Sequence, residues 1–192
     1  MMPTTSFELL CKAKFKKDRY RRLAKALGGI RNYGRNTPIT LLKILDVCGL
    51  YNAVWSLRAC PHSEKFALEF AYDCAEHALR FRNDQLNQVL EVARRITFSK
   101  ATADEIFMAR AILEEAMKKA TMPSDALATS MLFSLLSEPS KETAFSVATR
   151  AAAYVDQIDS KRHYPQWKAL QYEMEWQERH LREMLLRSYQ DD

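Results

Sequence analysis

All glycines of this chain lie within its first 49 residues. The sequence has 192 residues but only four glycines, and the last of them is Gly49. β-Hairpins, phosphate-binding loops and dinucleotide-binding folds need glycine for left-handed backbone or for close approach to a ligand. The three quarters of the chain that follow Gly49 therefore lack the signals of a P-loop, of a Rossmann fingerprint and of most β architectures. We expect an all-α protein.

The size and composition indicate a globular chain. Hydrophobic residues make up 47% of it and charged residues 28%, and a chain of this length can bury a core without disulfides or a structural metal. No stretch approaches the ~18 consecutive apolar residues of a membrane span, and basic residues stand where a signal peptide would have its apolar segment. Four cysteines without a disulfide-like pattern fit a reducing compartment. We therefore predict a cytoplasmic protein with no membrane contact and no cofactor.

Helix start and stop signals predict a series of helices after residue 36. Thr37 before Pro38 predicts a helix that ends at Gly49, and the apolar repeat from Leu50 predicts a second helix that ends before Pro61. Further starts are predicted at Ser63, at Asn83-Asp84, at Thr102 with Glu105 as a capping box, at Ser124 and at Pro165, with breaks near Pro123 and at Ser137-Glu138-Pro139. These signals predict about seven or eight helices.

Short links between these helices favour antiparallel hairpins, which form either a bundle or a short α-solenoid. Alanine is frequent at positions expected to face a neighbouring helix, where it allows close approach: Ala67, Ala71, Ala75, Ala78, Ala148, Ala151 and Ala152. No shift in composition marks a second domain after residue 36. We therefore predict a single helical domain over residues 37–192.

Positive charge is concentrated at the N-terminus. Residues 1–35 contain ten lysines and arginines but only two acids, Glu8 and Asp18, which gives a net charge of +8. Residues 36–192 carry a net charge of −3. We call residues 1–36 the N-terminal arm. Such an asymmetry indicates a binding partner, not a fold.

The cations of the N-terminal arm are candidates for binding nucleic acid or an acidic partner. They are Lys14, Lys16, Lys17, Arg19, Arg21, Arg22, Lys25, Arg31 and Arg35. Lysine and arginine neutralise phosphates, and rings such as Phe15 and Tyr20 would stack on bases. The alternative, which we favour, is a short amphipathic helix docked by Phe15, Tyr20, Leu23 and Leu27, with its charges facing water or an acidic protein surface.

Cysteine and histidine form a pattern that resembles a zinc site. Cys60-x-His62 and Cys74-x-x-His77 bring together residue types that bind zinc. Cys74, however, occupies an apolar position of its predicted helix, where a buried thiol behaves as a small hydrophobic side chain. The interpretation we favour is therefore a core cysteine and a surface histidine, with no metal bound.

Carboxylates offer the other route to metal chemistry. Glu69, Asp73 and Glu76 share a predicted helix at the spacing with which helical nucleotide hydrolases present carboxylates to magnesium, although a solvated helix face has the same pattern. No acid–base or nucleophile set can be assembled around the remaining histidines. His163 and His180 lie near Lys161, Arg162 and Arg179, without a serine or cysteine at a suitable spacing. We therefore predict a protein that is not an enzyme.

Three segments resemble one family. Residues 41–59 (LLKILDVCGLYNAVWSLRA), 70–79 (FAYDCAEHAL) and 175–185 (EWQERHLREML) are similar to segments of the immunity proteins of bacterial polymorphic toxin systems. The likeness covers roughly residues 38–186. It implies a helical, alanine-rich protein that protects a cell by binding a partner toxin, without a catalytic site. Relatives carried by phages are expected to bind a host factor instead.

These observations lead to one hypothesis and two alternatives. The leading hypothesis is a non-catalytic inhibitor of the immunity type, from a bacterium or a phage, that neutralises a protein partner by stoichiometric binding. The first alternative is a nucleic-acid-binding accessory protein that uses the N-terminal arm. The second is a magnesium-dependent nucleotide hydrolase. A candidate polar seam consists of Arg58, Asp73 and Glu76. We expect Leu50, Trp55 and Leu57 to belong to the core and not to a contact surface.

Overall fold

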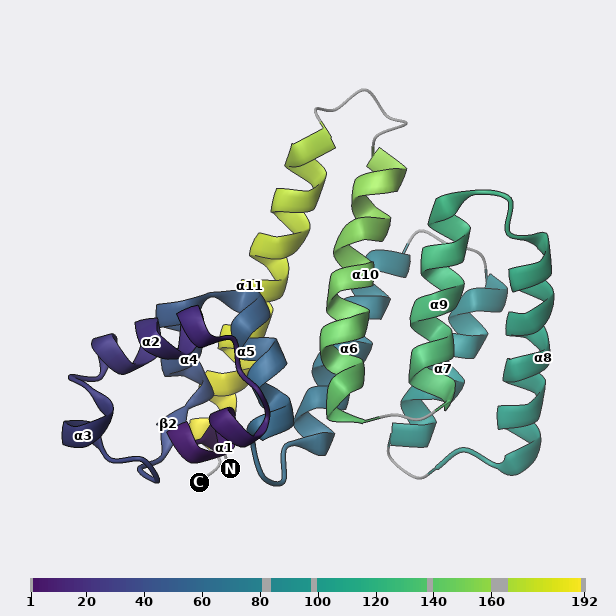
Figure 1. Cartoon of the computed structure of the whole chain (residues 1–192). Helices are drawn as coiled ribbons and strands as arrows, with labels where there is room; N and C mark the ends of the chain where they lie inside the picture. The colour runs from purple at the N-terminus through teal and green to yellow at the C-terminus, as the bar shows by residue number, and fades with distance from the viewer. Residues whose placement is uncertain (1, 81–83, 98–99, 138–139, 160–165, 191–192) are drawn as a thin grey trace. The chain divides into compact units, whose positions relative to one another are not determined.

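The structure, a computed structural model, describes residues 2–80, 84–97, 100–137, 140–159 and 166–190, and these ranges contain eleven α-helices (Figure 1). Two strands of two residues each are the only β-structure in this part of the chain. The all-α prediction is confirmed. Of these described helices, eight follow residue 36 and three short ones lie in the N-terminal arm. None of the described helices has the length and apolar character needed to cross a membrane.

The chain divides into two compact units. Unit 1 comprises residues 1–66 and 178–192, and unit 2 comprises residues 67–177. The predicted boundary between the N-terminal arm and the rest of the chain lies inside unit 1, and the division of the chain at residue 36 stays a prediction.

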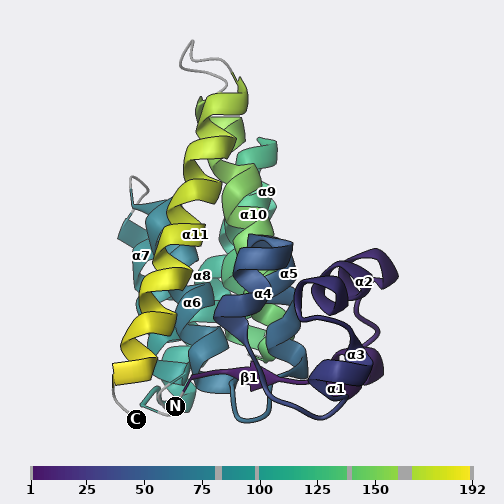
Figure 2. The same cartoon turned by 90° about the vertical axis from the view of Figure 1, so that its left-hand side faces the viewer.

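Unit 1 contains the short elements. They are β1 (Thr4–Thr5), α1 (Phe7–Lys12), α2 (Lys17–Ala26), α3 (Ile30–Tyr33), β2 (Ile39–Thr40), α4 (Leu41–Cys48), α5 (Leu50–Ser56) and the 3-10 helix η1 (Leu57–Ala59). Figure 2 shows α1, α2 and α3 grouped on one side of α4 and α5. The N-terminal arm is joined to the rest of unit 1 by the antiparallel β1–β2 pair and by the fully buried side chains of Phe7, Leu10 and Leu23.

Because of the strand pair, the first predicted helix begins later in the chain than the sequence indicated. Thr5 pairs with Ile39, so the backbone is still extended where the sequence predicted a helix. Helix α4 begins at Leu41, and its N-cap is Thr40, whose hydroxyl accepts a hydrogen bond from the Lys43 amide. The prediction that Thr37 caps this helix is wrong, because the Thr37 hydroxyl donates to the Tyr33 carbonyl instead. Gly49 ends α4 as predicted, with a positive φ of 82°.

Unit 2 is built from longer helices. They are α6 (Glu64–Leu79), α7 (Asp84–Thr97), α8 (Ala103–Lys119), α9 (Pro123–Ser137), α10 (Lys141–Asp159) and α11 (Gln166–Gln190), and α6 and α11 also contribute residues to unit 1. Helix α9 packs against α7, α8 and α10. Figure 1 shows α8, α9 and α10 beside one another, with α6 and α7 behind them. All seven alanines predicted to face neighbouring helices are buried.

Several predicted helix ends can be compared with the structure. Thr102 and Glu105 form the predicted capping box of α8, with both reciprocal hydrogen bonds present. Helix α9 begins at Pro123, so Ser124 is a buried residue of its first turn and the prediction of Ser124 as N-cap is wrong. Helix α7 begins at Asp84, and α9 ends at Ser137. The predicted signals at Asn83, Glu138, Pro139 and Pro165 lie outside the described residues.

Candidate functional site

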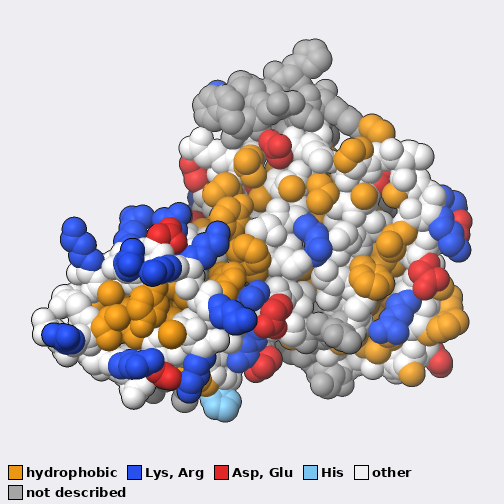
Figure 3. All heavy atoms as spheres, viewed as in Figure 1, with side chains coloured by type: hydrophobic (Ala, Val, Ile, Leu, Met, Phe, Trp, Pro, Cys, Tyr) orange, Lys and Arg blue, Asp and Glu red, His pale blue; other side chains and the backbone are white. Residues whose placement is uncertain are grey.

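The basic residues of the N-terminal arm separate into paired and unpaired cations. Arg19 pairs with Asp18, with 3.2 Å between Nε and Oδ2, and Arg35 pairs with Glu8. The other seven candidates are exposed and have no ion pair within the described part of the chain: Lys14, Lys16, Lys17, Arg21, Arg22, Lys25 and Arg31. We call these seven residues the basic surface. Figure 3 shows Lys and Arg side chains gathered around an apolar patch over α2 and α3.

Helix α2 sets the direction of the basic surface. Leu23 is fully buried and anchors one side of the helix in unit 1. Lys17, Arg21 and Lys25 follow one another at four-residue spacing, which places them on one side of the helix. Like charges at this spacing repel each other and cost about 0.2–0.5 kcal/mol per pair in an isolated helix. An anionic surface that binds here would relieve this repulsion.

The aromatic residues of the N-terminal arm are engaged in packing. Phe15 is buried and lies against Trp55, with ring centroids 5.4 Å apart. Tyr20 meets the ring of Phe7 edge to face at 5.2 Å, and its hydroxyl donates to the Phe7 carbonyl. Tyr33 also packs on Phe7, and its hydroxyl donates to the Pro38 carbonyl over 2.7 Å. These rings are therefore not free to stack on bases, whereas the cations remain free to contact an anionic partner.

The candidate polar seam is not assembled within either unit. Arg58 belongs to unit 1, where its guanidinium lies 4.7 Å from the centre of the Trp55 ring and its buried Nε has no hydrogen-bond partner in the described part of the chain. Asp73 is half-buried and Glu76 is exposed, and both lie on α6 in unit 2. The seam stays a prediction.

The residues of the zinc-like pattern belong to different units. Cys60 and His62 belong to unit 1, and Cys74 and His77 belong to unit 2. Within the described residues, no three or more His, Cys, Asp or Glu side chains form a group that could hold a metal ion. This finding covers both the zinc pattern and the three carboxylates Glu69, Asp73 and Glu76. Cys74 is a core residue, as the favoured interpretation expected.

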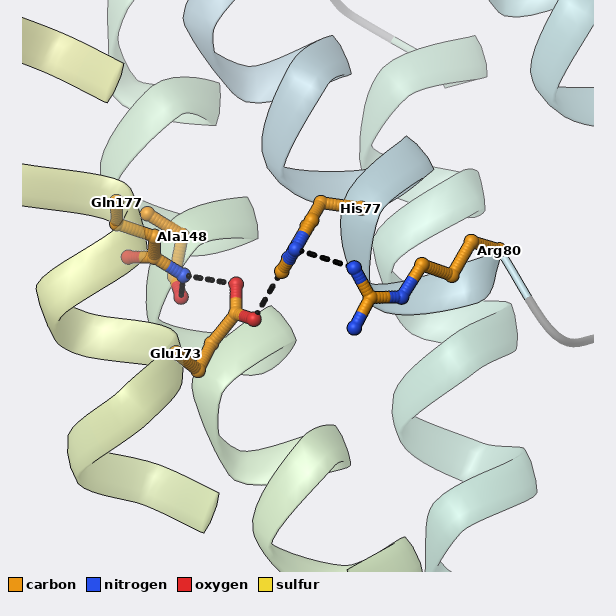
Figure 4. A network of polar contacts seen from close by, with 5 residues as sticks. All are labelled: His77, Arg80, Ala148, Glu173 and Gln177. Carbon is orange, nitrogen blue, oxygen red and sulfur yellow. Dashed lines mark hydrogen bonds and ion pairs between the residues drawn. The ribbon is translucent and has the colours of Figure 1, made fainter. Parts of the chain in front are cut away.

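His77 is not the surface histidine that the sequence suggested. Its side chain is only 12% exposed, and its ring stacks on Trp176 with centroids 3.7 Å apart and planes 5° apart. His77 Nδ1 lies 2.8 Å from Oε2 of Glu173, a carboxylate that is 1% exposed, and Arg80 Nη1 lies 2.7 Å from His77 Nε2 (Figure 4). The imidazole thus stands between a buried carboxylate and a guanidinium.

The partners of His77 fix its tautomer. A guanidinium can only donate hydrogen bonds, so His77 Nε2 must accept from Arg80. The ring proton then sits on Nδ1 and is donated to Glu173. In this tautomer the imidazole bridges the two residues, because it accepts a hydrogen bond from Arg80 and donates one to the buried carboxylate of Glu173.

Gln177 completes the set of donors to the Glu173 carboxylate. Its Nε2 donates to Glu173 Oε1 and to the Ala148 carbonyl, both over 3.0 Å. Because both neighbours are acceptors, the amide orientation is fixed, and the buried Oε1 of Gln177 has no hydrogen-bond partner among the described residues. Burial first, and the nearby carboxylates of Glu173 and Asp73 second, raise the pKa of the Cys74 thiol well above its usual range. Cys74 is therefore a protonated thiol and a poor nucleophile.

Sequence reasoning missed this network because the buried row of α11 is partly polar. Ala169, Glu173, Gln177, Leu181 and Leu185 are all buried and stand four residues apart. Leu170, Met174 and Met184 lie off this row, and all three are only half-buried. The available signal was the pair Glu173 and Gln177, polar residues placed in register with Leu181 and Leu185 on one row.

The chain was also compared with known proteins. No protein-family model, no curated protein and no solved structure matches it.

Proposed function

We propose that this protein is a non-catalytic inhibitor of the immunity type, or a phage-borne relative of one, that neutralises an acidic partner protein by stoichiometric binding in the cytoplasm. Its basic surface makes the contact, and helical hairpins in a bundle or short solenoid form its scaffold. The observation that carries the proposal is the set of seven exposed cations that have no ion pair within the described residues.

The charge of this surface suits association with an acidic protein. Complementary charge speeds the encounter of two proteins and selects against wrong partners. The acids closest in sequence to the basic surface do not neutralise it, because Asp18 pairs with Arg19 and Glu8 pairs with Lys12 and Arg35. The full charge of the seven cations is therefore available to a partner.

The segment that carries the family resemblance supports the scaffold and not the contact. Leu50, Val54 and Leu57 are buried in unit 1. Trp55 is covered by Phe15 and Arg58. We therefore assign the contact to the N-terminal arm, which lies outside the segments of the resemblance.

The experiment compares three forms of the full chain as bait in lysate of the source strain. The first is wild type and the second is Lys17→Glu/Arg21→Glu, which changes the charge of the basic surface by about four units. The third is the control Lys43→Glu/Lys100→Glu, which makes the same change at two exposed lysines outside this surface. Each lysate is divided into nuclease-treated and untreated halves, and the captured proteins and nucleic acids are identified and quantified.

We expect wild type and the control to retain one acidic protein at a 1:1 ratio in both halves. We expect Lys17→Glu/Arg21→Glu to lose at least about tenfold in affinity for that protein, and we expect binding by the other two forms to weaken as salt is raised. Recovery dominated by nucleic acid that disappears after nuclease treatment would overturn the proposal in favour of phosphate binding. Equal capture of a protein by all three forms would show that the basic surface does not make the contact.

A further inference from the structure

Exposed apolar side chains gather on α8 and α9 in unit 2. Eight large hydrophobic side chains are exposed in the described residues, and five of them lie on these helices or on the link between them: Phe107, Met108, Met117, Met122 and Phe133. Phe107 is the most exposed of the five, at 71%. Figure 3 shows apolar and charged side chains interspersed over this part of the surface. The concentration of exposed apolar side chains on these two helices makes this part of unit 2 a candidate interaction surface.

One row of α8 has the spacing of a helix–helix seam. Asp104, Phe107, Ala111, Glu114 and Lys118 follow one another at alternating intervals of three and four residues, and all five are exposed. This spacing keeps side chains on one stripe of a helix and is the spacing with which two helices pair along their length. The opposite side of α8 is covered within unit 2, where Ala109 and Leu113 are buried.

The charges at the two ends of this row are complementary to each other. Asp104 and Lys118 have no ion pair within the described part of the chain, whereas the neighbouring Glu115 and Lys119 pair with each other at 3.0 Å. Asp104 and Lys118 stand seven residues before and seven residues after Ala111. When two copies of the row lie antiparallel and cross at Ala111, each Asp104 meets Lys118 of the other copy. A parallel pair would place like charges together.

We propose that the exposed row of α8 is a self-association surface on which two copies of this chain pair antiparallel around a twofold axis at Ala111. The small side chain of Ala111 lets the helices approach at the axis, and each Phe107 covers the stem of Glu115 and the Ala111 of the other copy. A twofold contact of this kind uses the same patch on both partners. The self-association surface is separate from the proposed inhibitor contact, because it contains no residue of the basic surface.

Sedimentation velocity of the full chain over about a hundredfold range of concentration tests the pairing. A single helix pair is a small interface, so we expect a monomer–dimer equilibrium in the micromolar range. Asp104→Lys and Lys118→Asp each place like charges at both ends of the seam, and each variant alone should weaken the dimer about tenfold or more at low salt.

Mixing the two charge variants gives the decisive result. The Asp104→Lys chain carries a lysine at both ends of the row, and the Lys118→Asp chain carries an aspartate at both ends. In a 1:1 mixture, each end of the seam therefore joins opposite charges, and the mixture should form a heterodimer about as strongly as wild type forms its dimer. Because each chain in the mixture carries the same substitution as it does alone, an effect of either substitution on the stability of α8 cannot produce this restoration.

A matched pair of phenylalanines provides the control for the apolar part. Phe107→Ser should weaken the dimer about tenfold or more, whereas Phe133→Ser, which removes an exposed ring outside the row, should leave it unchanged. A wild-type chain that remains monomeric over the whole range overturns the proposal. So does a mixture of charge variants that associates no better than either variant alone.

Discussion

The carboxylate of Glu173 is buried between two hydrogen-bond donors, where water cannot compensate for a change of side chain. It accepts from His77 Nδ1 on one oxygen and from Gln177 Nε2 on the other. An amide at position 173 has one acceptor and one donor, so its NH2 group would face one of these donors in either orientation. Reversing the tautomer of His77 would not help, because Nε2 must accept from Arg80.

We therefore expect Glu173→Gln to lower the free energy of unfolding by about 1–3 kcal/mol, the usual cost of a buried donor without a partner. Urea unfolding followed by circular dichroism measures the change. Glu175→Gln is the matched control, since it makes the same substitution at an exposed position of α11 and should stay within about 0.5 kcal/mol of wild type. Equal stability of wild type and Glu173→Gln would falsify this donor arrangement around the carboxylate.

Helix α8 depends on its N-terminal cap, because its exposed row from Asp104 to Lys118 adds nothing to burial in the monomer. The Thr102 hydroxyl accepts from the Glu105 amide over 3.2 Å, and the Glu105 carboxylate accepts from the Thr102 amide over 2.8 Å. Thr102→Ala removes the first of these bonds and should destabilise the chain by about 1 kcal/mol. Thr121→Ala, at an exposed threonine between α8 and α9, should have no effect beyond about 0.5 kcal/mol.

Thermal unfolding of the two threonine variants beside wild type measures this difference. We expect a lower midpoint temperature of unfolding for Thr102→Ala than for Thr121→Ala, and the same midpoint temperature for Thr121→Ala and wild type. An equal loss of stability in both variants would show that it comes from removing a threonine hydroxyl in general and not from removing the helix cap.

Local signals predicted most of the fold, and long-range contacts account for the rest. The helix ends at Gly49 and Thr102 follow from single residues whose backbone or capping preference acts within one turn. Thr37 has the same local signal as a cap, but the pairing between Thr5 and Ile39, which no local pattern contains, keeps the following backbone extended. The cations of the basic surface were visible as charge, but their lack of partners depends on where Asp18 and Glu8 lie in three dimensions.

The stability of the whole chain should fall in alkaline solution because three buried acids hold their protons in the folded state. Burial is the main cause that raises the pKa of Cys74 and Cys48 above their usual range and the pKa of Tyr72 to about 12. An unfolded chain loses thiol protons around pH 8.5 and above. Above that pH the folded chain therefore binds more protons than the unfolded chain, so the stabilisation from these groups is fully present below it and decreases as pH rises.

Each fully protected thiol contributes a slope of at most about 1.4 kcal/mol per pH unit to this decrease. We expect urea unfolding between about pH 8 and pH 10.5 to show the decrease in wild type and a shallower decrease in Cys74→Ala. Cys11→Ala, at the exposed cysteine, should keep the wild-type slope. The slope is the quantity to compare, and not the absolute stability, because Cys74→Ala also leaves a small cavity at every pH. Parallel curves for Cys74→Ala and wild type would mean that the Cys74 thiol ionises in the folded chain as readily as in the unfolded one.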